Sequence, residues 1–541
     1  MSKLQPLTRR DILRAGLTAS ILPWLYQGQS AADELGKSKK PGETKLFLFV
    51  DWFHVKKGDL QVTLDPQRIS AEGKTLLETY ARDFKKTFDQ SGHGFKPVDV
   101  PFGIRIVQEQ ATRSKPWLLA DKPWEKSATS PTVLYDEGRY RCWYISRLKG
   151  EPQKMTADQE RLMEVSGSAL AYAESEDGIN WTKPVCGVLN FEGSRENNLV
   201  SPDNNGGSVF RDDHGPAEER YKGFHFDELP KEAAGSGSMA RYGLFGVSSP
   251  DGYHWKKNPK PLVRYFSDTV NIAGWDNEMG KYVGYFRHHL SGRTISRAET
   301  TDFWDWPAPQ PLLYAGPLDG PAEDYYTNCY TTYPGDPSLR LMFPAIYHRD
   351  SDSVDVRLSV SRDGRAFQWV SYNPILKLGA AGEWDGGSLY AHPNLVQLPD
   401  GRLALPYDAY NTTHNEVFFE NFYGDYNSTS GIAWALWDDA RLAGIQADQM
   451  GQFTMNAAIF EGQQIQLNAR TTQAGRIDVE LRDRGKAIPG FSFDDCVPLS
   501  GNLVWSRCQW KGQESLASLR GKYVELAIRL RSAKIFACRF V

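Results

Sequence analysis

The chain has 541 residues, more than one hydrophobic core normally supports, so its length predicts two or three domains. Its formal net charge is −4, from 63 basic and 67 acidic residues mixed along the chain. This argues against the basic stripe of a nucleic-acid-binding protein and against a like-charged interaction tail. No run of 18 or more apolar residues occurs, so no membrane span is expected.

The first 32 residues resemble an export signal. Arg9 and Arg10 precede a short, weakly apolar run at 15–25, and small residues follow at 30–32. A paired arginine before a modest apolar run is typical of a twin-arginine signal, so we expect an exported protein, periplasmic or extracellular. An ordinary amphipathic N-terminal helix is the alternative. Residues 33–44 are rich in Lys, Gly and Pro and indicate a linker.

A hairpin motif recurs through the middle of the chain. The pattern S-x-D-G-x-x-W is complete at 175–181 and 249–255, and 361–367 keeps all but the ring type. Residues 300–306 keep the Asp and the Trp, and an eroded fifth copy lies at 437–442. Asp-Gly predicts a tight turn, because Gly accepts positive φ and Asp accepts hydrogen bonds from local N–H groups. The Trp is expected to fold back over the hairpin.

Three β-patterned runs precede each hairpin. The first run of each set begins near 132, 208, 270, 329 and 393, at intervals of about 60 to 75 residues. Four-stranded units at such a period are blades of a propeller, and five copies predict five blades. A further strand at 45–52 is expected to complete the last blade and close the ring, which would remove exposed sheet edges.

After residue 445 the pattern changes to apolar–polar alternation, at 465–469, 476–481 and 523–528. Alternation of this kind predicts a small antiparallel β-sandwich of roughly 90 residues. The predicted fold class is therefore all-β, a five-bladed β-propeller followed by a small C-terminal antiparallel β-sandwich. The predicted segments are an export signal over 1–32, a linker over 33–44, the propeller over 45–444 and the sandwich over 445–541.

The six cysteines show neither a CxxC pair nor zinc-ligand spacing. One disulfide among Cys496, Cys508 and Cys538 is one interpretation, and buried free thiols are the other. The histidines at 288, 289, 348 and 392 also lack a recognisable ligand spacing. The sequence therefore predicts no metal and no other cofactor.

Three kinds of segment carry a resemblance to a known family: these hairpins, residues 267–271 followed by 275–282, and residues 393–401. In these segments the chain resembles the five-bladed propeller glycoside hydrolases. That group includes invertase-like, arabinofuranosidase-like and mannoside-phosphorylase-like enzymes. More narrowly, residues 45–541 resemble exported proteins that join a propeller to a β-sandwich. The resemblance implies a carbohydrate substrate. The chain lacks the W-x-N-D-P-N-G, R-D-P and E-C motifs that carry catalysis in invertase-like enzymes, so fructan hydrolysis is not implied.

Glycosidic cleavage generally takes two carboxyl groups across the scissile bond. Acids that lead into successive inner strands should converge on the propeller axis. We expect Asp268 to act as base or charge stabiliser and Glu323 or Asp324 as general acid. Asp203 and Asp385 would complete the acid/base set or hold sugar hydroxyls. For any one of these acids, a solvated loop residue or a cap is the alternative.

Amide, hydroxyl and ring side chains near the same strands are expected to contact the sugar, because flat rings stack on sugar C–H faces. Packing within a blade is the alternative for each. Arg287 and Arg293 would suit a carboxylate or sulfate of an acidic glycan, although solvated arginines are commoner at strand ends. The predicted substrate-binding residues are Glu383, Trp384, Asn271, Tyr326, Asn328, Tyr390, His392 and Asp51.

Three functions compete at this point. The leading prediction is a glycoside hydrolase acting on a polysaccharide or oligosaccharide in the central funnel. The alternative is a propeller that binds glycans without cleaving them. A sugar phosphorylase would need Arg, Lys or His clustered for phosphate, and no such cluster precedes the inner strands. The expected partner in each case is a carbohydrate, with no nucleic acid and no membrane span.

Overall fold

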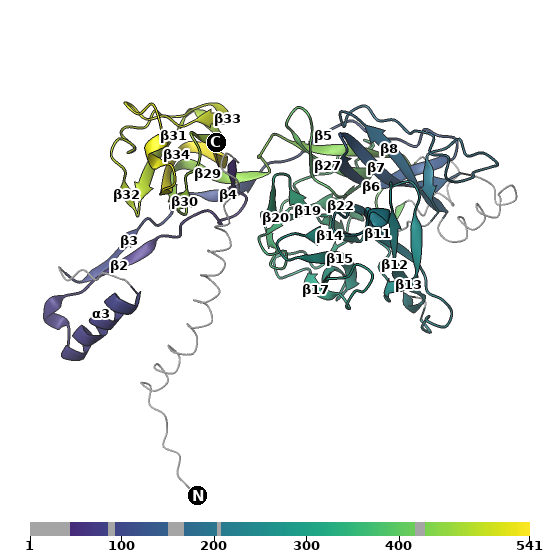
Figure 1. Ribbon diagram of the computed structural model, residues 1–541, viewed down its shortest axis with the longest axis horizontal. Helices are drawn as coiled ribbons and strands as arrows, with labels where there is room; N and C mark the ends of the chain where they lie inside the picture. The colour runs from purple at the N-terminus through teal and green to yellow at the C-terminus, as the bar shows by residue number, and fades with distance from the viewer. Residues whose placement is uncertain (1–43, 85–91, 150–166, 203–206, 238, 417–427) are drawn as a thin grey trace, which may run out of the picture.

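The computed structural model describes residues 44–84, 92–149, 167–202, 207–237, 239–416 and 428–541 (Figure 1). The predicted export signal and most of the predicted linker lie outside these residues, as does Asp203. The regular structure of the described part of the chain is almost entirely β-strand. None of its helices is long and apolar enough to cross a membrane.

Four antiparallel sheets of four strands each form a β-propeller arrangement (Figure 1). The first two sheets are β6 (Glu125–Asp136), β7 (Arg139–Leu148), β8 (Ser168–Ser175), β9 (Leu199–Ser201), and β10 (Val209–Arg211), β11 (Tyr221–Glu228), β12 (Tyr242–Ser249), β13 (Lys256–Val263). The other two are β14 (Ile272–Asp276), β15 (Lys281–His289), β16 (Arg293–Thr300), β17 (Gln310–Leu313), and β19 (Tyr330–Tyr333), β20 (Asp336–Met342), β23 (Ser359–Ser361), β24 (Gln368–Trp369).

An eight-stranded sheet completes this part of the molecule. Four neighbouring strands within it repeat the pattern of the other sheets and are called the β26–β27–β28–β5 set here. The strands are β18 (Glu323–Tyr325), β21 (Ala345–His348), β22 (Ser353–Val356), β25 (Ser388–Ala391), β26 (Val396–Gln397), β27 (Leu403–Tyr410), β28 (Ser430–Trp437) and β5 (Thr112–Arg113). A segment upstream of β6 therefore supplies the edge strand of this set.

The strand predicted to close the ring has a different partner. β1 (Lys45–Leu48) pairs with β34 (Tyr523–Phe540), so the prediction that residues 45–52 complete the last blade is wrong. The reason is that both faces of this segment are apolar and buried. Phe47 and Phe49 enter the core of the C-terminal sheet, while Leu48 and Val50 enter the propeller core. The segment lies between two cores.

The C-terminal strands belong to one connected antiparallel sheet, into which β1 and β4 enter from the N-terminal part of the chain. β34 is its central strand and pairs with β1, β29, β30 and β31. The two-sheet sandwich stays a prediction. The remaining strands are β4 (Arg105–Gln108), β29 (Ala443–Thr454), β30 (Ala458–Ile459), β31 (Ile465–Asp483), β32 (Lys486–Ala487) and β33 (Asn502–Arg507).

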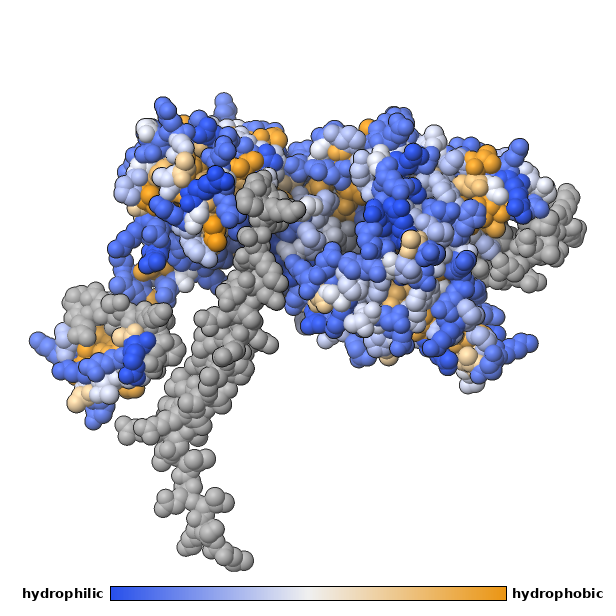
Figure 2. Space-filling model, viewed as in Figure 1, coloured by the Kyte–Doolittle hydropathy of each residue, from blue (hydrophilic) through white to orange (hydrophobic). Residues whose placement is uncertain are grey.

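An arm extends from the C-terminal sheet, away from the propeller (Figure 1). It contains a two-stranded hairpin and the α-helix α3, and most of its described side chains are exposed. Elsewhere the visible surface is mainly hydrophilic, with separate apolar patches (Figure 2). The arm elements and the short helices are β2 (Asp59–Thr63), η1 (Pro66–Arg68), α3 (Ala71–Phe84), β3 (Gly94–Val98), η3 (Ala217–Glu219), η4 (Met239–Arg241) and η6 (Ala517–Leu519).

The recurring Asp-Gly motif forms the predicted hairpins. In the copy at 249–255, Asp251 accepts hydrogen bonds from the N–H groups of Tyr253 and His254, and Ser249 accepts one from Gly252. Trp255 Nε1 donates to the carbonyl of Gly252. The motif is therefore a self-contained turn, as its composition indicates.

All six cysteines are free, and five of them are buried. The disulfide interpretation for Cys496, Cys508 and Cys538 is therefore not supported. Burial raises the pKa of these thiols, so they pack as small apolar side chains.

Candidate functional site

Every described carboxylate among the predicted site residues has an arginine partner. An ion pair of this kind orients a carboxylate and occupies part of its hydrogen-bonding capacity. The six pairs are Asp51–Arg362, Asp268–Arg287, Glu323–Arg357, Asp324–Arg293, Glu383–Arg113 and Asp385–Arg113.

Asp268, Arg287, Arg293, Tyr326 and His414 form one group, called the arginine–tyrosine cluster here. The guanidinium carbons of Arg287 and Arg293 lie 4.2 and 4.9 Å from the centroid of the Tyr326 ring. The His414 ring centroid lies 4.7 Å from the same ring. Cations at these distances are attracted by the ring face. The cluster combines Arg287 of β15 and Arg293 of β16 with residues from the loops before β14, after β18 and after β27.

Asp268 is the accessible carboxylate of the cluster. Its side chain is 40% exposed, whereas the Arg287 side chain is 2% exposed. Arg287 donates to Asp268 Oδ1 through Nη1 and to the carbonyl of Tyr326 through Nε and Nη2, at 3.3 and 3.0 Å. The buried arginine thus holds the carboxylate from one side and leaves the other side open to solvent.

Asp324 is buried instead, with 3% of its side chain exposed. Its Oδ2 accepts from Arg293 Nη1 at 2.9 Å and from Arg349 Nη2 at 2.6 Å, and its Oδ1 accepts from the Arg293 N–H at 3.2 Å. Asp324 therefore orders the turn between β15 and β16 and holds two arginines. This geometry does not suit the predicted role of general acid, because a leaving group has no open approach to the carboxyl group.

Glu323 lies beside Asp324 on β18, and successive side chains of a strand point to opposite faces. Glu323 accepts from Arg357 Nη2 at 2.6 Å and lies 3.5 Å from His348 Nδ1. Burial raises the pKa of Glu323, but the hydrogen bond and charge of Arg357 outweigh it and lower the pKa below its ordinary value. A carboxyl group of lowered pKa is a poor proton donor near neutral pH.

The predicted residues at 383–385 contact strands β5 and β27 of the β26–β27–β28–β5 set. Asp385 Oδ2 accepts from Arg113 Nη1 at 2.8 Å, and Arg113 lies on the edge strand β5. Trp384 stacks on Tyr407, with ring centroids 5.9 Å apart. Glu383 accepts a hydrogen bond from the Ala380 N–H. These contacts give the turn before β25 a structural role.

Asn271 and Asn328 are almost fully buried. Asn271 Nδ2 donates to the carbonyls of Ser267 and Thr269, and Asn328 Nδ2 donates to that of Val270. Both amides brace the inner strands, so the structure gives them a packing role in place of the predicted contact with a sugar.

Tyr390 and His392 lie near the cluster at different depths. Tyr390 Oη lies 2.7 Å from His414 Nδ1. His392 is 2% exposed and pairs through Nε2 with Asp408 Oδ1, while no described residue hydrogen-bonds to its Nδ1. Tyr390 can support a ligand through His414, whereas His392 lies below the accessible surface.

His414 is the functional candidate that the sequence reasoning missed. Burial and the charge of Arg293 lower its pKa to about 4, so the ring is neutral at pH 7, with one ring nitrogen able to donate a hydrogen bond and the other able to accept one. A signal for it exists in the sequence. That signal is a histidine at the same place in two repeats. His289 ends β15, the second strand of its sheet, and His414 follows β27, the second strand of its set.

Comparison with known proteins finds no matching family model and no matching curated protein. Solved structures that match include one described as a glycoside hydrolase, with 14% identity and a TM-score of 0.40, covering 61% of this chain and 94% of that chain. An α-L-arabinofuranosidase from Podospora anserina in complex with cellotriose has 12% identity and a TM-score of 0.38, covering 61% and 98%.

An N-acetylgalactosamine deacetylase from F. plautii in complex with blood group B trisaccharide has 16% identity and a TM-score of 0.38, covering 62% and 96%. About three fifths of this chain is thus similar in structure to nearly the whole of each of these proteins. Identities of 12–16% at these TM-scores establish neither a family nor an activity.

Within the described ranges, no group of three or more His, Cys, Asp or Glu side chains is arranged to hold a metal ion.

Proposed function

We propose that the chain is a glycoside hydrolase whose sugar-binding site is the arginine–tyrosine cluster, with Asp268 as its catalytic carboxylate. In this proposal the β26–β27–β28–β5 set acts as the fifth blade of the propeller. The observation that carries the proposal is the half-exposed carboxylate of Asp268, oriented by the buried Arg287 beside the ring of Tyr326.

The chemistry follows from that position. Glycosidic cleavage passes through a transition state with positive charge at the anomeric carbon, which an oriented carboxylate stabilises. The Tyr326 ring and the neutral His414 would contact the sugar beside it, and Arg293 would donate hydrogen bonds to hydroxyl or carboxylate oxygens. Asp324 acts as a positioning residue because it holds Arg293 and Arg349.

One observation favours the second candidate function, a propeller that binds glycans without cleaving them. All six described carboxylates predicted for the site are paired with arginine. An acid paired with arginine is a poor proton donor, and hydrolysis takes a donor opposite the catalytic carboxylate. A glycan-binding protein needs no such donor.

Release of reducing sugar from a polysaccharide panel tests the proposal. Asp268→Asn should lower kcat/KM by about 100-fold or more, since it removes the charge that stabilises the transition state. Asp448→Asn is the matched control, because Asp448 is also paired with an arginine, Arg105, but on the C-terminal sheet. Thermal denaturation of each variant separates lost folding from lost chemistry.

Equal turnover by Asp268→Asn and the wild-type chain would remove the catalytic assignment. Binding of a glycan without release of product would establish the second candidate. The export signal over 1–32 stays a prediction, and secretion of a reporter fused to it would test it.

A further inference from the structure

A cleft of about 1060 Å³ lies between the hairpin at 361–367 and the segments 51–57 and 101–104. Its position differs from that of the arginine–tyrosine cluster. None of the five residues of the cluster lines the cleft.

Three aromatic side chains of the cleft are exposed. Trp52 is 43%, Phe53 41% and Phe102 55% exposed, although large aromatic residues are normally well buried. Exposed rings in one concave site mark a binding surface, because a ring offers a flat apolar face. The guanidinium carbon of Arg362 lies 4.6 Å from the centroid of the Phe53 ring and covers part of that ring. The volume of the cleft is at the upper end of the range for small-molecule sites.

The charges in the cleft balance. Its ionisable lining residues are two acids, Asp51 and Asp363, and two bases, Lys57 and Arg362. Arg362 donates to Asp51 through Nε and Nη2, at 2.9 and 3.1 Å, so these two charges are paired with each other. A site without excess charge does not select an anion or a cation. Rings beside the amide side chains of Gln368 and Asn456 suit a neutral ligand with many hydroxyl groups.

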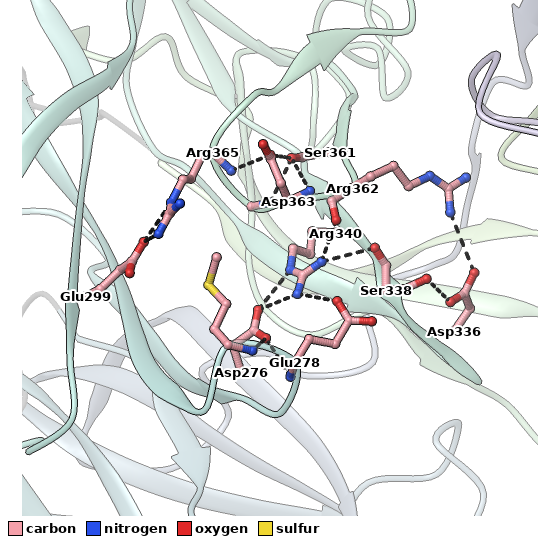
Figure 3. Close-up of polar contacts among 12 residues, drawn as sticks. Asp276, Glu278, Glu299, Asp336, Ser338, Arg340, Ser361, Arg362, Asp363 and Arg365 are labelled. Atoms are coloured by element: carbon pink, nitrogen blue, oxygen red, sulfur yellow. Dashed lines mark hydrogen bonds and ion pairs between the residues drawn. The ribbon is translucent and has the colours of Figure 1, made fainter. Parts of the chain in front are cut away.

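The wall of the cleft is held in place by a polar network (Figure 3). Arg340 is nearly fully buried, donates to Asp276 and Glu278, and donates to the carbonyl of Arg362 at 2.8 Å. Arg362 also faces Asp336 at 3.8 Å. The backbone that carries Arg362 is therefore fixed before a ligand arrives, which reduces the entropy that binding would cost.

We propose that this cleft is an accessory binding site for a neutral oligosaccharide, with Trp52 and Phe102 as stacking platforms. The proposal does not depend on hydrolysis at Asp268. A chain that binds a polysaccharide here would remain associated with it whether or not the cluster cleaves it.

Affinity electrophoresis and calorimetry with soluble arabinan, xylan, galactomannan and β-glucan test the proposal, with polygalacturonate as the anionic comparison. We expect the wild-type chain to bind at least one neutral polymer. The Trp52→Ala/Phe102→Ala variant should weaken that binding at least tenfold, and Gln368→Ala should weaken it less. Phe95→Ala is the matched control, since Phe95 is exposed on the arm.

Three results would overturn the proposal. One is the absence of binding to every neutral polymer, and another is equal binding by the wild-type chain and the Trp52→Ala/Phe102→Ala variant. The third is a concentration-dependent dimer in sedimentation that this variant abolishes, which would assign the rings to contact with a second copy. The side chains of Trp52, Phe102, Gln368 and Phe95 are all exposed, and circular dichroism would check that the variants fold.

Discussion

Asp324 holds two arginines from different turns with one buried carboxylate. Removing one partner of a buried ion pair costs more than the pair contributes, because the remaining charge stays in a poorly solvated position. Asp324 is also the contact that keeps Arg293 beside Tyr326. At the scale of single residues, the cluster therefore depends on an acid that does not itself meet the solvent.

The variant Asp324→Asn should lower the free energy of unfolding by about 2 kcal/mol, since the arginines it leaves are only partly exposed. Urea denaturation measures this loss. Asp350→Asn, an exposed neighbour, should change stability by less than about 0.5 kcal/mol. Equal stability of the two variants would contradict the role given to Asp324.

His414 makes stability depend on pH. Burial and Arg293 lower its pKa from 6.5 to about 4 in the folded chain, whereas the unfolded chain keeps the ordinary value. Between pH 6.5 and 4 the unfolded state therefore binds a proton that the folded state does not, and acidification through this window destabilises the fold. The variant His414→Gln should lose less stability between pH 7 and 4.5 than the wild-type chain. Parallel curves of unfolding free energy against pH would refute this.

Part of the cluster is predictable from sequence. The rule that acids lead into inner strands identifies Asp268 and its neighbour Asp324, and the expected ring at Tyr326 contacts both Arg287 and Arg293. The arginine partners are not predictable in the same way. Arg349 pairs with Asp324, and Arg357 pairs with Glu323, in each case from a different part of the chain. Such pairs depend on the register between strands, which no local sequence pattern specifies.

At the scale of elements, the Asp-Gly hairpins join neighbouring sheets. Trp143 on β7 donates to the carbonyl of Gly252 at 2.7 Å, and Trp434 on β28 donates to that of Gly178 at 2.7 Å. Tyr285 on β15 donates to that of Gly364 at 2.9 Å. The motif thus forms its own turn and also accepts a hydrogen bond from a ring of an adjacent sheet. The repeats predict the turn because its hydrogen bonds are local. They do not predict the hydrogen bond from the adjacent sheet, because it joins residues far apart in the sequence.

Gly252→Ala tests this contact. A Cβ at this position would lie 2.5 Å from the Trp143 ring, and the backbone φ is +84°. The left-handed backbone and the clash together should cost about 2 to 4 kcal/mol. Gly187→Ala is the matched control, because Gly187 has a φ of +69° with open space around it, so only about 1 kcal/mol is expected. Chemical denaturation compares the two, and similar losses would show that the ring contact is unimportant.

At the scale of the whole molecule, the propeller and the C-terminal sheet share apolar contacts. The cluster of buried residues that contains Leu341 and Leu405 of the propeller also contains Leu48, Val50 and Ala537. The sequence does not predict this shared core, because residues 45–50 have the composition of a strand that could belong to either domain. Parts that share a core are expected to unfold together.

Calorimetry should therefore show one cooperative transition for the chain. Leu48→Ala should lower the midpoint of the whole transition, since deleting a fully buried leucine costs about 2 to 5 kcal/mol. Leu60→Ala is the matched control, because Leu60 is 52% exposed on the arm, and it should leave the midpoint unchanged. Two separated transitions, with Leu48→Ala moving only one, would show independent domains.

The pairing of β1 with β34 also constrains how the chain is made. Synthesis proceeds from the N-terminus, so β1 leaves the ribosome long before its partner exists. Nor can β29 and β31 complete their pairing until β34 has been translated. Contacts so distant along the chain form slowly, and the nascent protein must keep the apolar side chains of β1 from aggregating until the last strand arrives.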